Sequence, residues 1–312
     1  MRFVIVGPGA LGSVLGAALA DAGHELVLLG RPSAHLAALG KGGLLLTSRN
    51  GQTRRLHLTV TDDPETAAGA DVVIVLVKAG DTVAAMRGIA PHIGPGQTVV
   101  TLQNGLGNVA RIRGVLGDRA RILPGTTSQA ATRLGPGEVA HTGDGPTLVG
   151  FGDANDARMA ARIARVLSEA GWPAAATSDI ERWIWHKAAV NAAINGLTAL
   201  GGFVNGEIAT DPNLLDSAEL IAEEAASVAR AQGIELGGMR RAVLETAMAT
   251  EVNRSSMLQD IEAGRRTEVA AIHGAILAAG EESGVDTPAI RVVEALISAK
   301  ERMMAKAQGN DG

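Results

Sequence analysis

The stretch of sequence that decides the fold is Arg2-Phe3-Val4-Ile5-Val6-Gly7-Pro8-Gly9-Ala10-Leu11-Gly12. Its first five residues form a short apolar run, which is typical of a strand buried in a parallel sheet. The next six match the pattern G-x-G-x-x-G. Small residues from 13 to 22 then predict a helix, and residues 24–29 predict a second strand. A strand, a glycine-rich turn, a helix and a strand in this order predict a dinucleotide-binding site.

The three glycines of this turn have separate tasks in such a site. Gly7 permits the tight turn, Gly9 lets a pyrophosphate approach the backbone, and Gly12 lets the helix pack closely on the strand. The N–H groups at the helix start then face the phosphate charge, whereas a glycine-rich turn without a ligand is the alternative. We expect the cofactor to contact the six residues Gly7, Pro8, Gly9, Ala10, Leu11 and Gly12.

The end of the second strand indicates which dinucleotide binds. NAD enzymes usually carry Asp or Glu there, to hold the ribose hydroxyls. Here the strand ends in Leu28-Leu29-Gly30-Arg31, so no carboxylate is available. The guanidinium of Arg31 offers a planar fork for a 2′-phosphate, and we therefore predict NADP(H). An exposed loop arginine is the alternative.

Further strands are predicted in the first half, and polar residues follow two of them. Lys78 follows the apolar run at 71–77, and Asn104 follows the run at 97–102. Ligands collect at the carboxyl ends of parallel strands, so both side chains are candidate ligand contacts, with capping as the alternative. The other elements expected here are strands at 44–46 and 56–60 around an Asn50-Gly51 turn, strands at 121–123, around 139 and 148 and at 174–177, and a helix at 153–170.

The second half lacks strand patterns and is predicted to be helical. We expect an α/β Rossmann-type N-terminal domain at 1–178 that binds NADP, and an all-α C-terminal domain at 179–312 that binds substrate and holds the catalytic groups. Helices are expected at 180–196, 212–232, 238–252, 257–283 and 288–306.

Three polar residues lie four apart in the first of these helices. Lys187, Asn191 and Asn195 share one helix face in the run 185–195, which is otherwise mostly Ala, Val and Ile. Asn is a mediocre helix former, and burying such groups without partners costs a few kcal/mol each. A polar partner should therefore face them, and we expect that partner to be a ligand. A surface lysine is the alternative for Lys187.

Composition excludes several classes of function. The 312 residues carry a net charge of −5 without a strongly basic block, which argues against nucleic acid as a partner. There is no cysteine, and the seven histidines lack zinc-like spacing, so no metal site is expected. The sequence contains no run of 18 apolar residues, so we expect no membrane span. Gly7-Pro8-Gly9 interrupts the apolar N-terminus, so we expect a cytoplasmic protein rather than an exported one. A homodimer is allowed.

The motifs together resemble the ketopantoate reductases (2-dehydropantoate 2-reductases), over nearly the whole chain. The second-half motifs are the specific ones, because the glycine pattern alone belongs to many families. The resemblance is carried by Gly7-Pro8-Gly9-Ala10-Leu11-Gly12, Arg31, Lys78-Ala79, Asn104-Gly105-Leu106-Gly107, Gly125-Thr126-Thr127, the run 187–195, Asn205-Gly206-Glu207, Ser255-Ser256-Met257-Leu258-Gln259-Asp260 and Arg266-Thr267-Glu268.

The resemblance implies NADPH-dependent reduction of 2-dehydropantoate to (R)-pantoate, in pantothenate and coenzyme A biosynthesis. It implies that Lys187 is the general acid and that Glu268 is a carboxylate at the junction of cofactor and substrate. An N-cap by Ser255 or Ser256 is an additional structural role for that segment. The implied substrate contacts are Asn104, Lys187, Asn191, Asn195, Asn205, Asn253 and Ser256, and the implied cofactor contacts beyond the glycine turn are Arg31, Lys78, Asn104, Ala131 and Glu268.

The proposed chemistry suits these residues. Hydride addition puts negative charge on a carbonyl oxygen, and a lysine with a pKa of about 10.4 would be protonated at neutral pH and ready to donate. Departures from the family pattern at Gly196, Gly80-Asp81-Thr82 and Gly201-Gly202-Phe203 leave the substrate open. Reduction of a different 2-keto acid is therefore one alternative, and a protein that senses NADPH without turnover is another.

Overall fold

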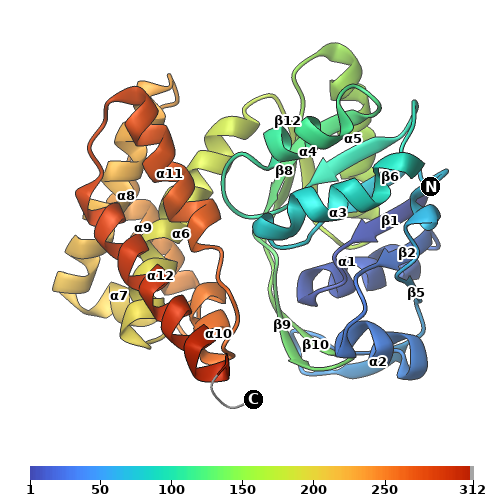
Figure 1. Ribbon diagram of the computed structural model, residues 1–312, viewed down its shortest axis with the longest axis horizontal. Coiled ribbons are helices and arrows are strands. Elements are labelled where there is room, and N and C mark those ends of the chain that lie inside the picture. The colour runs from blue at the N-terminus through green and yellow to red at the C-terminus, as the bar shows by residue number, and fades with distance from the viewer. Residues whose placement is uncertain (310–312) are drawn as a thin grey trace. The chain divides into compact units, whose positions relative to one another are not determined.

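The computed structural model describes residues 1–309, and the chain divides into two compact units (Figure 1). The first unit comprises Met1–Gln103 and Asn108–Ile180. The second comprises Asn104–Gly107 together with the residues from Glu181 onward. Four residues from the first half of the sequence thus pack with the helical half.

An eight-stranded sheet forms the centre of the first unit, with the strand order β12-β11-β8-β7-β6-β1-β2-β5. Only β8 and β11 pair antiparallel; the other neighbouring strands of this sheet are parallel. This confirms the predicted fold class for the N-terminal half. The strands are β1 (Arg2–Val6), β2 (Glu25–Leu29), β5 (Thr59–Thr61), β6 (Val72–Val75), β7 (Thr98–Thr101), β8 (Arg121–Thr127), β11 (Thr147–Gly150) and β12 (Ala174–Thr177).

Both faces of this sheet are buried, which explains its continuous apolar runs. Phe3 and Ile5 of β1 pack on one side with α1 and α5, and Val4 and Val6 pack on the other side with α3 and α4. The first-unit helices are α1 (Ala10–Asp21), α2 (Ala34–Gly42), α3 (Thr82–Ile89), α4 (Asn108–Leu116) and α5 (Ala154–Glu169), with short 3₁₀ helices η1 (Pro64–Ala67), η2 (Ala79–Asp81) and η3 (Ala90–His92).

A smaller sheet of order β4-β3-β10-β9 completes the first unit, and β9 and β10 pack against α1. Its strands are β3 (Leu44–Thr47), β4 (Thr53–Leu56), β9 (Ala130–Gly135) and β10 (Glu138–Gly143). The single strand expected at 56–60 is wrong, because β4 ends at Leu56 and β5 begins at Thr59 in the other sheet. The exposed, polar β4 has no apolar run by which it could have been recognised.

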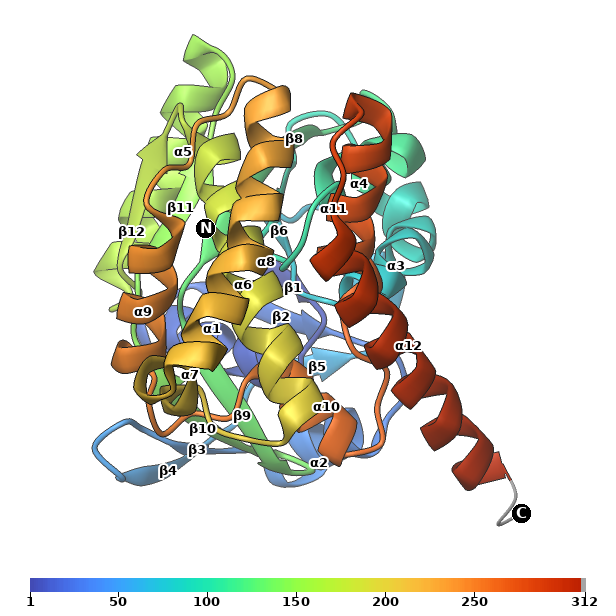
Figure 2. The same ribbon diagram turned by 90° about the vertical axis from the view of Figure 1, so that its left-hand side faces the viewer.

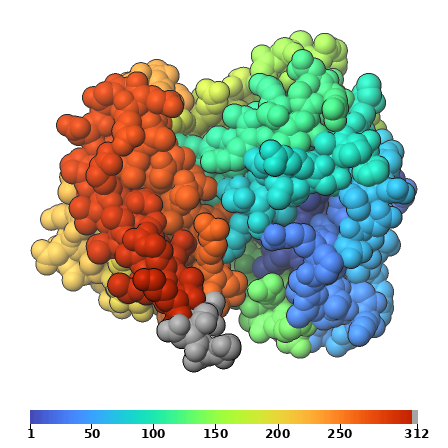
Figure 3. Space-filling view, in the orientation of Figure 1, coloured from blue at the N-terminus to red at the C-terminus, as the bar shows by residue number. Residues whose placement is uncertain are grey.

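The second unit is helical, as predicted, and is built around a core rich in alanine. Helices α11 and α12 contact each other and run side by side (Figure 2), and α12 lies at the surface of this unit (Figure 3). No helix of the described residues is long and apolar enough to cross a membrane. The helices are α6 (Ile180–Gly201), α7 (Gly206–Thr210), α8 (Pro212–Ala231), α9 (Met239–Ala249), α10 (Ser256–Glu262), α11 (Val269–Ser283) and α12 (Pro288–Gly309).

The helix expected at 257–283 is in fact two helices. Helix α10 ends at Glu262, and α11 begins only at Val269. Gly264 between them has a φ of +64°, a left-handed conformation that ends a helix. Glu268 therefore stands at the N-cap of α11 and not inside a helix. The short helix α7 was also missed.

Candidate active site

The glycine turn of the first unit has the backbone that its sequence requires. Gly7 has a φ of +105°, and a Cβ on it would lie 2.5 Å from the Val77 nitrogen. A Cβ on Gly12 would lie 2.3 Å from the Gly7 oxygen, so close packing excludes side chains at both positions. A Cβ on Gly9, the N-cap of α1, would meet no atom within 4 Å. Packing does not explain a glycine there, whereas a ligand that approaches the backbone would.

The other residues predicted to contact the cofactor lie on elements that adjoin this turn. Arg31 follows β2 and Lys78 follows β6, the two strands that flank β1. Lys78 is the N-cap of η2, but its side chain makes no capping hydrogen bond. Ala131 lies on β9, which packs against α1. The donors and the turn geometry fit a dinucleotide, whose phosphates would meet the N–H groups at the start of α1.

Arg31 forms an ion pair within the chain that the sequence analysis did not foresee. Its Nη2 atom lies 2.8 Å from Oδ2 of Asp81, and the two side chains are 78% and 40% exposed. In the sequence, only the departure from the family pattern at Gly80-Asp81-Thr82 had marked the position of Asp81 as unusual.

In the second unit, Lys187, Asn191 and Asn195 occupy successive turns on one face of α6, as predicted. Asn195 is buried, and Asn191 is partly buried. Among the described residues, neither side-chain amide has a hydrogen-bond partner. Amides without a protein partner add no hydrogen bond to the fold, so stability alone does not explain these two asparagines.

Lys187 differs from the sequence-based expectation in its protonation. Burial lowers the pKa of its ammonium group to about 8, although the nearby Glu268 carboxylate acts to raise it. The expected value of about 10.4 was wrong because desolvation outweighs the carboxylate. The ammonium group is thus a stronger acid than an ordinary lysine and titrates close to neutral pH.

Glu268 contacts Asn104–Gly107, the segment from the first half of the sequence that belongs to the second unit. Nδ2 of Asn104 donates to Oε2 of Glu268 at 3.1 Å. The Leu106 nitrogen donates to the Ala271 oxygen at 3.0 Å, in the first turn of α11. Gly105 has a φ of +83°, and a Cβ on it would lie 2.3 Å from that same oxygen. The glycine therefore allows the close approach that brings Asn104 to Glu268.

A buried histidine docks α11 on the helix that carries Lys187. His273 is fully buried, its Nε2 atom lies 2.9 Å from the Ala192 oxygen, and its Nδ1 atom has no partner among the described residues. Burial lowers its pKa to about 4, so the ring is neutral at pH 7. A Cβ on Gly196 would lie 2.8 Å from Nε2, which explains the glycine there. The sequence analysis missed His273.

The remaining predicted substrate contacts surround the start of α10. Ser255 caps this helix by accepting from the Leu258 nitrogen, and its Oγ atom also accepts from Oγ1 of Thr198 on α6 at 2.7 Å. The bond joins the Lys187 face of α6 to the α10 start. Ser256 is exposed and Asn253 is partly buried, and neither side chain has a hydrogen-bond partner among the described residues.

Asn205, unlike Asn253 and Ser256, makes a side-chain hydrogen bond within the fold. Its Nδ2 atom donates to Oγ1 of Thr250 at 2.9 Å, and its backbone nitrogen donates to the Asn253 oxygen. Its Oδ1 atom is buried and has no partner among the described residues. A ligand hydroxyl could reach that oxygen only if the chain around Asn205 shifted.

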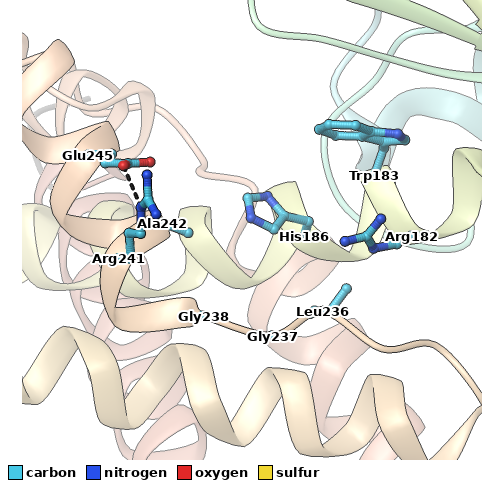
Figure 4. Close-up of a pocket in the computed structure, with 9 residues that line it drawn as sticks. All are labelled: Arg182, Trp183, His186, Leu236, Gly237, Gly238, Arg241, Ala242 and Glu245. Carbon is cyan, nitrogen blue, oxygen red and sulfur yellow. Dashed lines mark hydrogen bonds and ion pairs between the residues drawn. The ribbon is translucent and has the colours of Figure 1, made fainter.

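A pocket of about 260 Å³ lies elsewhere in the second unit (Figure 4). Trp183 and His186 of α6 line it, and Arg241 pairs there with Glu245. None of the residues predicted to bind cofactor or substrate lines this pocket, so it is separate from the Lys187 face of α6.

The chain matches family models along most of its length. Residues 3–154 match the model "Ketopantoate reductase PanE/ApbA", and residues 179–301 match the model of its C-terminal part. A 2-dehydropantoate 2-reductase of Halobacterium salinarum is 37% identical over 97% of this chain and 99% of its own length. One of Archaeoglobus fulgidus is 39% identical over 95% of this chain and 96% of its own length.

Solved structures have the same fold. A PanE/ApbA family ketopantoate reductase from Ralstonia eutropha has a TM-score of 0.88 and 29% identity, covering 98% of this chain and all of its own. D-mandelate dehydrogenase with NADH and anilino(oxo)acetate has a TM-score of 0.91 and 28% identity, with the same coverage. From these matches and the lysine–asparagine face of α6, we conclude that the chain belongs to the ketopantoate reductase PanE/ApbA family.

Proposed function

We propose that this protein reduces 2-dehydropantoate to (R)-pantoate with NADPH, as a step towards pantothenate and coenzyme A. The curated relatives carry the name of this activity over nearly the full chain length. Within the proposal, the first unit binds NADPH, and the second unit binds the keto acid and supplies the proton. The proposal includes a cytoplasmic location.

One observation carries the proposal most directly. A lysine of lowered pKa shares a helix face with two amides that have no hydrogen-bond partner among the described residues. A small 2-keto acid offers a carboxylate and a carbonyl oxygen, and both accept hydrogen bonds from such donors. The polar face of α6 is therefore chemically complementary to the substrate class.

The residues divide the work as follows. When it is bound, the reduced nicotinamide supplies the hydride that adds to the carbonyl carbon. Lys187 stabilises the negative charge that develops on the carbonyl oxygen and transfers a proton to that oxygen. Asn191, Asn195 and Ser256 donate hydrogen bonds to the substrate's carboxylate or hydroxyl. Glu268 favours the charged form of Lys187, and Asn104 orients Glu268 through the bond at 3.1 Å.

The test is to follow nicotinamide absorbance with purified protein, NADPH and 2-dehydropantoate. We expect absorbance loss that requires both compounds. Replacement of Arg31 by Ala should weaken the binding of NADPH far more than the binding of NADH, because only NADPH carries the 2′-phosphate. Equal weakening of both cofactors would contradict the role of Arg31. Binding of NADPH without its oxidation by any keto acid would instead indicate a sensor.

A second candidate is the reduction of a different 2-keto acid by the same chemistry. The likeness to D-mandelate dehydrogenase favours this alternative, since that enzyme shares the fold. A panel that includes the 2-keto acid obtained by oxidising mandelate would separate the candidates through the ratio of kcat/KM values.

A further inference from the structure

The ion pair between Arg31 and Asp81 crosses the predicted nucleotide site. Arg31 follows β2, and Asp81 ends η2 after β6. These strands lie on opposite sides of β1, with Leu29 and Val75 both in register with Val6. Neighbouring strands are about 4.8 Å apart, so the pair bridges a gap of about 10 Å over the end of β1.

Both loops that carry the pair touch the glycine turn between them. A Cβ on Gly30 would lie 2.6 Å from Cδ of Pro8, and a Cβ on Gly7 would lie 2.5 Å from the Val77 nitrogen. The two charged groups thus flank the point where the strand order reverses direction, which is where open α/β sheets bind nucleotides.

Asp81 changes what this end of the site can recognise. Strand β2 ends without the carboxylate that commonly holds ribose hydroxyls, but Asp81 brings one from the β6 side to within 2.8 Å of Arg31. That carboxylate offsets part of the guanidinium charge and repels a 2′-phosphate. It can also accept a hydrogen bond from an unphosphorylated ribose. Because the pair is largely exposed, it is weak enough for a nucleotide to rearrange.

We propose that Asp81 is a cofactor-selectivity residue, which lowers the preference for NADPH that Arg31 creates and lets the protein bind NADH as well. The inference rests on the proposed function, since it requires the nucleotide to bind at the glycine turn.

The experiment measures the dissociation constants of NADPH and NADH for the full-length protein, by quenching of tryptophan fluorescence at fixed ionic strength. Asp81→Asn removes the charge but keeps the polar group, and Asp81→Ala removes both. The control is Glu281→Gln, which removes the carboxylate of the exposed Arg291–Glu281 pair in the second unit.

We expect Asp81→Asn to lower the dissociation constant of NADPH about two- to fivefold, which is the range for the loss of one exposed ion pair. The dissociation constant of NADH should change less than about twofold. Asp81→Ala should also weaken NADH, and Glu281→Gln should leave both constants unchanged. An unchanged or lowered preference for NADPH in Asp81→Asn would overturn the selectivity role, because it would mean that Asp81 merely orients Arg31. If wild-type protein binds neither nucleotide, the proposed function itself fails.

Discussion

Asn104 and Glu268 are separated by 164 positions in the sequence, yet they are joined by a hydrogen bond of 3.1 Å within the helical unit. Glu268 in turn raises the pKa of Lys187 against the effect of burial. A residue that follows a strand of the sheet therefore orients the carboxylate that acts on the proposed proton donor. This relationship makes Asn104 a positioning residue, and it links the protonation of Lys187 to the packing of one loop.

Replacement of Lys187 by Ala should lower kcat on the order of a hundredfold or more, because the proton donor is lost. The control is Lys306→Ala, which removes an exposed lysine of α12 and should leave turnover unchanged. Steady-state kinetics and circular dichroism would measure activity and folding together. Near-normal turnover by a folded Lys187→Ala protein would exclude Lys187 as the acid.

The rate should depend on pH through Lys187. Since the donor must be protonated, we expect kcat/KM to fall as pH rises through about 8, the lowered pKa of this lysine. Glu268→Gln removes the charge that raises this pKa, so the alkaline limb should move to lower pH. The measurement is a pH–rate profile for both proteins. A limb that stays in place, or moves to higher pH, would argue against the coupling.

Gly105→Ala should destabilise the second unit. The added methyl group would lie 2.3 Å from the Ala271 oxygen, at a φ of +83° that alanine adopts poorly. We expect the free energy of unfolding to fall by more than about 1 kcal/mol. Gly114→Ala is the matched control, because it lies in α4 with no atom within 4 Å of the added Cβ. That substitution should stabilise the protein by about 0.5–1 kcal/mol. Equal effects of the two would refute the packing argument.

The asparagines should separate into binding and structural groups. Asn191→Ala and Asn195→Ala should raise KM about tenfold with little change in Tm, since their amides have no partners among the described residues. Asn205→Ala should instead lower the free energy of unfolding by about 1 kcal/mol, because it breaks the bond to Thr250. Kinetics and thermal unfolding of all three variants would test this division. A large loss of Tm in the first two would assign them to the fold.

His273 should make the protein less stable in acid. Its pKa is about 4 when folded and about 6.5 when unfolded, so the unfolded chain binds more protons between these values. Stability should therefore fall as pH decreases below about 6.5. The histidine alone should contribute a loss of about 2 kcal/mol between pH 7 and pH 5.

Urea unfolding of wild type and His273→Gln at both pH values would isolate this contribution. The variant should lose less stability than wild type on acidification. His57→Gln, at an exposed position, should behave like wild type. A wild-type-like acid response in His273→Gln would contradict the buried neutral state.

The sequence predicted those features that depend on local patterns. The glycine turn, the parallel strands and the polar face of α6 each follow from spacing over a few residues, and the structure has all three elements. The break between α10 and α11 was missed because Gly264 interrupts an otherwise helical pattern. A glycine in such a run is often tolerated, so this signal was ambiguous.

The features that could not be predicted depend on distant contacts. The acidity of Lys187 follows from how deeply tertiary packing buries its ammonium group, which spacing does not reveal. A lone histidine among apolar residues suggested nothing about the Ala192 oxygen that His273 contacts. Likewise, the composition of Gly80-Asp81-Thr82 marked a departure, but only the fold brings Asp81 to Arg31.

The membership of Asn104–Gly107 in the helical unit limits how this chain can be recombined with a relative. A single crossover near residue 180 would combine the loop of one parent with the α11 of the other, and the Leu106–Ala271 bond would then join unmatched surfaces. A chimera that exchanges residues 104–107 along with the C-terminal half would preserve that contact. Gene shuffling in this family should therefore recover active hybrids more often when the short loop travels with the helices.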